Sequence, residues 1–362
     1  RAFAIENALH WLAEYRFDGL RLDAVNAIHE PGEIPLLRDL SMAVGKLAAE
    51  TGRHIHLLLE NGDNAASLLD AGQDPARGKF RAQWNDDYHH AWHVWLTGET
   101  QGYYGDHTTS PLRDIARALG SGFVYQGEAS AFRGGQLRGE PSGHLAPAAF
   151  VNFIQNHDQI GNRALGDRLE NHVDTDAIEA AMAITLMAPA VPMLFMGEEW
   201  GSKTPFPFFC GFEGELADAV REGRRREYDW AYADHGEGVP DPLALSTFRS
   251  AVLDWDERSR PEGKKRLALV RELLAIRRRE IVPRLAGAAF GHAHAADNGL
   301  LAADWRMGDG ATLRLLANLS DIAVARKESQ TESETAGTVI WGGEASGLIA
   351  PWSVFWRIGA GP

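Results

Sequence analysis

Cysteine is nearly absent from this chain of 362 residues, which has only Cys210. An intramolecular disulfide and a zinc site built from cysteines are therefore excluded. Such low cysteine usage is typical of a reducing compartment, so we expect a cytoplasmic location and an inert buried thiol at Cys210. No uninterrupted apolar run approaches the roughly 20 residues that a membrane helix needs, so we expect no membrane partner.

Basic residues are the minority among the charged side chains. The 36 Lys and Arg residues face 50 Asp and Glu residues, and the formal net charge is -14. Nucleic acids are held by clustered Lys and Arg, so we expect no nucleic-acid partner. The basic run at residues 224–226 lies between Glu222 and Glu227, which favours ion pairs within the protein. The length suffices for one large domain and a smaller one.

Predicted strands and helices alternate over residues 1–283. Apolar runs predict strands over residues 17–23, 54–60, 80–84, 150–155 and 193–196. Helical spacing predicts helices over 2–15, 34–47, 87–96, 112–119, 177–187 and 267–274, and loops over 103–110 and 121–147. This alternation indicates an α/β fold whose parallel strands carry the functional residues at their carboxyl ends.

The pattern changes after Pro283. Short strands are predicted over residues 300–305, 312–319, 338–341 and 353–357, and a solvated loop over 327–334. We therefore expect two domains, the α/β part over residues 1–283 and a small antiparallel β domain over residues 284–362.

Carboxylates follow three of the predicted strands: Asp23, Glu60 and Asp158. Asp23 and Glu60 follow consecutive strands, and neighbouring parallel strands lie ~4.8 Å apart. Their carboxylates can therefore come within the ~5–5.5 Å that separates the two acids of a retaining glycosidase. In such enzymes one carboxylate attacks the anomeric carbon, and the other protonates the leaving oxygen and then activates water.

The neighbours of these acids favour a division of roles. Arg21 shares a strand face with Asp23, and a nearby guanidinium keeps a carboxylate ionised, as a nucleophile requires. Glu60 follows three leucines and has no adjacent cation in the sequence, a dry setting that raises the pKa of an acid. We expect Asp158 to hold sugar hydroxyls or to stabilise an oxocarbenium ion, with His157 as a hydroxyl donor.

Three aromatic side chains are candidates for stacking on sugar rings: Trp84, Tyr103 and Tyr104. Core packing is an equally good interpretation for Trp84, whereas the glycines around the two tyrosines favour their exposure. The adjacent residues His89 and His90 point to different faces of a helix, so we expect no metal site there.

Each feature taken singly also has a structural interpretation. Arg21 and Asp23 can form an ion pair, Glu60 can cap the helix that follows, and His157 can hydrogen-bond Asp158 within a loop. Ion-pair networks also occupy the ends of strands. Three acids after three strands of one α/β chain nevertheless favour the catalytic interpretation.

The segments that carry these acids resemble motifs of the α-amylase family of glycoside hydrolases. Residues 18–25 (DGLRLDAV) resemble its nucleophile motif, 58–61 (LLEN) its acid/base motif, and 153–158 (FIQNHD) the motif of its transition-state-stabilising Asp. The resemblance implies that Asp23 is the nucleophile, Glu60 the acid/base and Asp158 the stabiliser, with Arg21 and His157 in support. It implies no cofactor.

Longer stretches resemble the members of this family that release trehalose from maltooligosyl trehalose. They are residues 83–90, 96–99, 102–104, 155–167, 195–205 and 220–227. The implied reaction is hydrolysis of the α-1,4 bond next to the terminal trehalose, and the implied partner is maltooligosyl trehalose or a related α-glucan. A glycogen branching enzyme, or another α-glucan transferase, remains an alternative, because the branching enzyme has a segment similar to residues 83–86 of this chain.

The family fold is a (β/α)8 TIM-type barrel, and only five of its eight strands are predicted here. By resemblance, the strand that ends at Asp23 is the fourth, so we expect strands four to eight without the first three and their subsite motif. A sheet of five strands has two open edges. We therefore expect poor stability and little activity from this chain alone, and an inactive fragment is a third interpretation.

Overall fold

The computed structural model describes residues 1–29, 35–69, 80–227, 229, 238–325, 336–345 and 347–360. Its first sheet consists of β1 (Gly19–Leu22), β2 (His56–Leu59), β3 (Ala82–Trp84), β6 (Phe150–Asn152) and β7 (Val191–Pro192). These strands are parallel and lie in the order β1-β2-β3-β6-β7. The five-stranded parallel sheet predicted from the sequence is confirmed.

The fifth strand lies earlier than predicted. Its pairing with β6 ends where the N–H of Met193 donates to the carbonyl of Asn152 at 2.9 Å. The chain then leaves the sheet and turns at Gly197, whose φ of 89° suits glycine. The prediction over residues 193–196 was therefore wrong, because the apolar run continues beyond the strand.

Helices follow or precede each strand, as the apolar spacing predicted. They are α1 (Ala2–Ala13), α2 (Leu36–Thr51), α3 (Asp86–Thr97), α4 (Pro111–Ser121), α5 (His157–Gly161) and α6 (Thr175–Met187). Single turns lie at η1 (Val25–Ala27), η2 (Ala66–Leu68), η4 (Pro147–Ala149) and η5 (Leu169–Asn171). The loop predicted over 103–110 overlaps the turn η3 (Gly102–His107). The irregular segment predicted over 121–147 contains a hairpin of β4 (Glu128–Ser130) and β5 (Gln136–Arg138).

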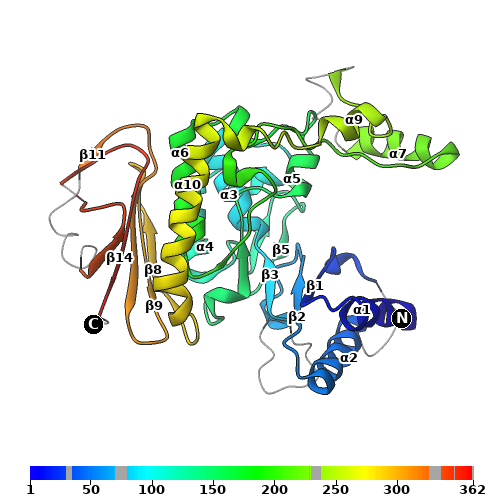
Figure 1. Cartoon of the computed structure of the whole chain (residues 1–362), viewed down its shortest axis with the longest axis horizontal. Coiled ribbons are helices and arrows are strands. Elements are labelled where there is room, and N and C mark those ends of the chain that lie inside the picture. Colours follow the sequence, from blue (N-terminus) through cyan, green and yellow to red (C-terminus); the bar gives the residue numbers. More distant parts are fainter. Residues whose placement is uncertain are drawn as a thin grey trace.

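Two helices after β7 form an arm that projects from the body beside α5 (Figure 1): α7 (Gly214–Glu227) and α9 (Leu245–Ser250). The turn η6 (Glu198–Trp200) precedes the arm, and η8 (Glu257–Ser259) follows it. Helix α10 (Pro261–Ile276) then returns to pack against α6 and continues into η9 (Arg277–Ile281) and η10 (Val282–Arg284).

The second sheet is antiparallel and has the order β12-β14-β10-β9-β8. Its strands are β8 (Ala289–Ala295), β9 (Leu300–Arg306), β10 (Thr312–Asn318), β12 (Thr338–Trp341) and β14 (Ser353–Gly359), and β11 (Val324–Ala325) pairs separately with β13 (Leu348–Ile349). The antiparallel β region is confirmed. Strand β8 was not predicted, because its sequence AFGHAHA has few of the branched and aromatic residues that mark strands.

One large core joins the antiparallel sheet to the helices of the α/β part. Trp305 of β9 and Trp356 of β14 stack with ring centroids 5.6 Å apart, and Trp305 also donates to the carbonyl of Leu119 at 3.0 Å. The domain boundary at residue 283 stays a prediction. The loop predicted over residues 327–334 lies outside the residues that the structure describes.

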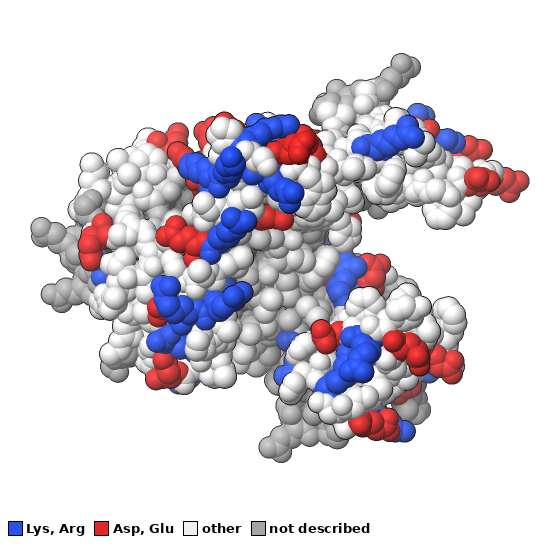
Figure 2. Space-filling view, in the orientation of Figure 1, with Lys and Arg blue, Asp and Glu red and all other residues white. Residues whose placement is uncertain are grey.

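A second, smaller core lies between the first two helices and the first two strands. Leu12, Leu57 and Leu59 are buried there, between α1, α2 and β2. On the face seen in Figure 2, Lys and Arg side chains are interspersed with Asp and Glu. No helix among the described residues is long and apolar enough to cross a membrane.

Candidate active site

The carboxyl ends of β1 and β2 place two acids at the same level of the sheet. Leu22 pairs with Leu59, so Asp23 and Glu60 are the first residues beyond two paired strands. The N–H of Glu60 donates to the carbonyl of Leu22 at 2.9 Å, and the N–H of Val25 donates to the carbonyl of Glu60 at 3.0 Å. Backbone hydrogen bonds therefore hold both strand ends in register.

The guanidinium of Arg21 contacts both acids. Its Nη1 forms a close ion pair with Asp23, and its Nη2 donates to Oε2 of Glu60 at 2.5 Å. Glu60 has no cation next to it in the sequence, but the fold brings the guanidinium of Arg21 to it. Arg21 pairs with Leu58 on the neighbouring strand, and its long side chain reaches across from β1 to the end of β2.

Glu60 keeps its proton more readily than an ordinary glutamate, in spite of this cation. Burial raises the pKa of Glu60, and Asp23 and Asp158 add to the increase, against the N–H of Ala24 and the charge of Arg21. The Ala24 N–H donates to Oε2 at 3.0 Å from a left-handed backbone with a φ of 40°. The side chain of Glu60 is 19% exposed, whereas that of Asp23 is 80% exposed.

Asp158 lies in the first turn of α5 and is half-buried. The side chain of Asn156 caps this helix and accepts from the N–H groups of Asp158 and Gln159 at 2.9 and 3.1 Å. The amide of Asn162 donates to Oδ1 of Asp158 at 3.3 Å. The charge of Asp158 contributes to the raised pKa of Glu60.

The predicted aromatic residues differ in their surroundings. Trp84 is half-buried, with the Arg21 guanidinium 4.1 Å above its ring centroid and the exposed ring of His157 5.8 Å away. Tyr103 is half-buried and stacks on His90 with centroids 4.6 Å apart. Trp84 and His157 therefore lie beside the acids.

Tyr104 lies in the core, so the prediction that it is exposed was wrong. Its side chain is 4% exposed, and its ring stacks on His93 of α3 with centroids 4.0 Å apart. The ring nitrogen of His89 also contacts its hydroxyl at 3.3 Å. The turn η3 directs Tyr104 into the protein, and its ring face is not available to a sugar.

Asp86 is a fourth acid that the sequence reasoning did not assign to this site. It opens α3, two residues after the end of β3, the strand that lies between β2 and β6 in the sheet. Burial and the charges of Glu60 and Asp158 raise the pKa of Asp86 to about 7. The amide of Gln159 donates to it at 3.4 Å. An acid two residues after a predicted strand was the available signal.

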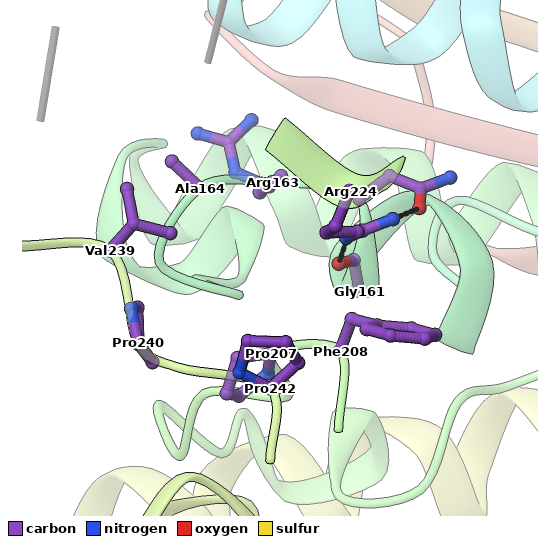
Figure 3. Close-up of a pocket in the computed structure, with 10 residues that line it drawn as sticks. Gly161, Arg163, Ala164, Pro207, Phe208, Arg224, Val239, Pro240 and Pro242 are labelled. Carbon is purple, nitrogen blue, oxygen red and sulfur yellow. Dashed lines mark hydrogen bonds between the residues drawn. The ribbon is translucent and has the colours of Figure 1, made fainter. Parts of the chain in front are cut away.

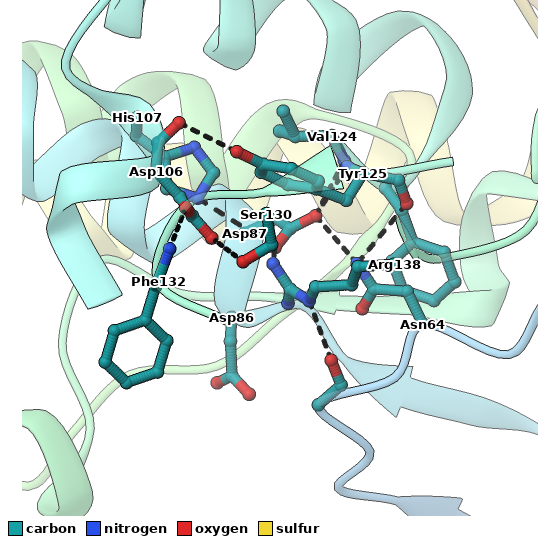
Figure 4. A network of polar contacts seen from close by, with 12 residues as sticks. Asn64, Asp86, Asp87, Asp106, His107, Val124, Tyr125, Ser130, Phe132 and Arg138 are labelled. Carbon is teal, nitrogen blue, oxygen red and sulfur yellow. Dashed lines mark hydrogen bonds and ion pairs between the residues drawn. The ribbon is translucent and has the colours of Figure 1, made fainter. Parts of the chain in front are cut away.

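A buried cluster behind this site offers three side chains of types that can bind a metal ion: Asp87, His90 and His107, with donor atoms within 4.8 Å of one another. Arg138, however, pairs with Oδ1 of Asp87 at 2.7 Å. The other oxygen of Asp87 accepts from Asn64 and from the N–H groups of Val124 and Tyr125 at 2.8, 3.0 and 2.9 Å (Figure 4).

The guanidinium of Arg138 thus supplies the positive charge that a cation would bring to Asp87, and the cluster does not fit a metal. The network instead ties α3 to the β4–β5 hairpin. In Figure 4 the side chain of Asp86 points away from it. The neighbouring acids Asp86 and Asp87 therefore have separate surroundings.

Comparison with known proteins gives a consistent assignment. A family model described as a domain of unknown function, DUF3459, matches residues 288–356. The malto-oligosyltrehalose trehalohydrolase of a Rhizobium species is 41% identical over 293 residues, which cover 80% of this chain and 48% of that protein. Its namesake from Brevibacterium helvolum is 37% identical over 359 residues, 98% of this chain and 59% of that protein.

A crystal structure described as a putative alpha amylase from Salmonella typhimurium has a TM-score of 0.87 and 41% identity to this chain. It covers 98% of this chain, which in turn covers 59% of that structure. The chain thus spans between 48% and 59% of the length of these relatives. In sequence, the chain is similar to the part of these malto-oligosyltrehalose trehalohydrolases that it covers, and in fold to the structure described as a putative alpha amylase.

Proposed function

We propose that this chain carries the catalytic residues of a retaining glycoside hydrolase acting on maltooligosyl trehalose. One observation carries the proposal: Asp23 and Glu60 follow paired strands, and both contact the guanidinium of Arg21. The relatives' name supplies the substrate class. The five parallel strands would be strands four to eight of a (β/α)8 barrel. We propose a cytoplasmic location. The mechanism needs no cofactor.

In the first step, Asp23 attacks the anomeric carbon of the glucose linked to the trehalose unit. The bond to the leaving oxygen breaks, and this oxygen keeps the electron pair of the bond. It takes a proton from Glu60. Trehalose leaves, and the maltooligosyl group stays bound to Asp23 as an ester. The guanidinium of Arg21 stabilises the charged carboxylate before the attack.

In the second step, the carboxylate of Glu60 takes a proton from water. The water oxygen attacks the anomeric carbon, the ester bond breaks, and its electron pair returns to Asp23. Two inversions give net retention of the α configuration. Asp158 supplies negative charge to the oxocarbenium-like transition states, and Trp84, His157 and Tyr103 would contact the sugar.

The test is product analysis with the full polypeptide that its gene encodes, incubated with maltooligosyl trehalose. We expect free trehalose and a shortened maltooligosaccharide that is released first as its α-anomer. New α-1,6 branches in place of trehalose would assign the protein to the α-glucan transferases. A product released first as its β-anomer would contradict the retaining mechanism.

A further inference from the structure

We propose that Arg224 is a positioning residue that orients Asp158 through the side-chain amide of Asn162. Arg224 lies on α7, in the projecting arm, more than sixty residues after Asp158 in the sequence. The arm would therefore contribute to the active site without contacting the reacting atoms. The inference rests on the proposed role of Asp158 and adds a residue that the sequence motifs do not include.

Two hydrogen bonds connect Arg224 to the acid. Its Nη1 donates to Oδ1 of Asn162 at 2.9 Å, and Nδ2 of Asn162 donates to Oδ1 of Asp158 at 3.3 Å. Asn162 follows the last residue of α5, one helical turn beyond Asp158. The amide therefore lies between the guanidinium and the carboxylate, with one end on each.

The chemistry of the three groups permits only one orientation of this amide. A guanidinium is exclusively a donor, so Arg224 requires the carbonyl oxygen of Asn162. The amide nitrogen must then face Asp158, whose carboxylate is exclusively an acceptor when ionised. Without Arg224 the amide is free to rotate and to turn its oxygen toward the carboxylate, which removes the donor from Asp158.

Further contacts hold Arg224 at this place. Its Nη2 donates to the carbonyl of Gly161, and its guanidinium lies 4.5 Å above the ring centroid of Phe208. Figure 3 shows Arg224 next to Gly161 and near Phe208, at the edge of a pocket lined also by Pro207 and Pro242. The guanidinium is thus fixed by a ring, a backbone carbonyl and the Asn162 amide, as a rigid positioning group requires.

The test compares Arg224→Met and Arg224→Lys with a matched control, Arg221→Met, in the full polypeptide. Arg221 lies one turn earlier on the same helix and pairs at the surface with Asp218 and Asp241, each at 3.1 Å. We expect Arg224→Met to lower kcat about ten-fold with little change in KM, because an oriented Asp158 acts in the transition state. Arg224→Lys should recover part of the loss, and Arg221→Met should match the wild type.

A double-mutant cycle with Asn162→Ala shows whether Arg224 acts through Asn162 or whether the two residues act independently. If Arg224 acts through Asn162, the double variant loses no more activity than either single variant. Additive losses, or a loss confined to KM, would overturn the proposal. Equal losses in Arg224→Met and Arg221→Met would also overturn it, since they would report a general weakening of α7.

Crystal structures of the two methionine variants provide a readout that does not depend on the substrate. The contact between Asn162 and Asp158 should be lost in Arg224→Met and kept in Arg221→Met. If it persists in both, the positioning role is wrong, whatever the enzyme cleaves. If the wild type releases no trehalose, the proposed function fails, and the structures still decide the role of Arg224.

Discussion

Arg21 donates to Glu60 at 2.5 Å, and yet the pKa of Glu60 is raised. Two opposing effects act on this carboxyl group, and burial outweighs the cation. The same guanidinium pairs with Asp23, whose side chain is largely exposed. One cation therefore serves two acids in different surroundings, and this difference separates a proposed nucleophile from a proposed proton donor.

Replacement of Arg21 by methionine should move the basic limb of the pH profile upward. Arg21 lowers the pKa of Glu60, so its loss raises that pKa further and keeps the acid protonated to higher pH. The measurement is kcat/KM for trehalose release as a function of pH. We also expect a lower overall rate in the variant. Arg21→Lys should shift the limb less, because the charge remains while the two-pronged contact is lost. A limb that moves downward would contradict this account.

Glu60→Gln should lower kcat on maltooligosyl trehalose by roughly 10²–10⁴-fold, the contribution of a positioned acid and base. An α-glycosyl fluoride provides the control, because fluoride leaves without protonation. The variant should therefore form the glycosyl ester from the fluoride at a rate near that of the wild type and hydrolyse it slowly. Equal losses in both steps would instead indicate a structural role for Glu60.

Asp23→Asn should abolish formation of the covalent intermediate and lower kcat roughly 10⁴-fold, as does removal of one member of a catalytic unit in other hydrolases. Mass spectrometry after rapid quenching detects the glycosyl ester in the wild type. The matched control is Asp18→Asn, because Asp18 precedes the same strand and its side chain is 93% exposed. Retained activity in Asp23→Asn would remove Asp23 from the nucleophile role.

Asp86 should make stability depend on pH. The pKa of Asp86 is about 7 in the fold, whereas the ordinary value for an aspartate is 3.8. Between these two pH values the folded state therefore holds a proton that the unfolded chain releases. Stability from this group is present below the lower value and lost as the pH rises through the upper one. Urea unfolding of Asp86→Asn should therefore show a stability that increases relative to the wild type from pH 4 to pH 8. A difference that does not change with pH would contradict the raised pKa of Asp86.

Trp356→Ala should destabilise the protein by about 3–5 kcal/mol, the usual cost of deleting a large buried aromatic side chain. Trp356 is fully buried and stacks on Trp305, where the antiparallel sheet meets the helices. The control is Leu348→Ala at the edge of this region, which is 60% exposed and should change stability by less than about 0.5 kcal/mol. Comparable effects of the two substitutions would mean that the joint core is not a main source of stability.

The sequence by itself determined the order of the parallel strands along the chain and the acids that follow them. These features depend on local signals: apolar runs of strand length, helical spacing, and a glycine after α2 that takes the left-handed backbone with a φ of 64°. The segments around Asp23, Glu60 and Asp158 were equally local, so the acids could be named before the fold was known. Strand β8 lacked such a signal and was missed.

Only the tertiary structure decided which groups surround these acids. The contact of Arg21 with Glu60 crosses between strands, the burial of Tyr104 depends on α3, and Asp86 joins the site because β3 lies between β2 and β6. The hydrogen bond from Arg224 to Asn162 spans 62 residues of sequence. Local sequence patterns determine the helices and strands. Burial and long-range contacts set the environment of each side chain, and these cannot be predicted from a local pattern.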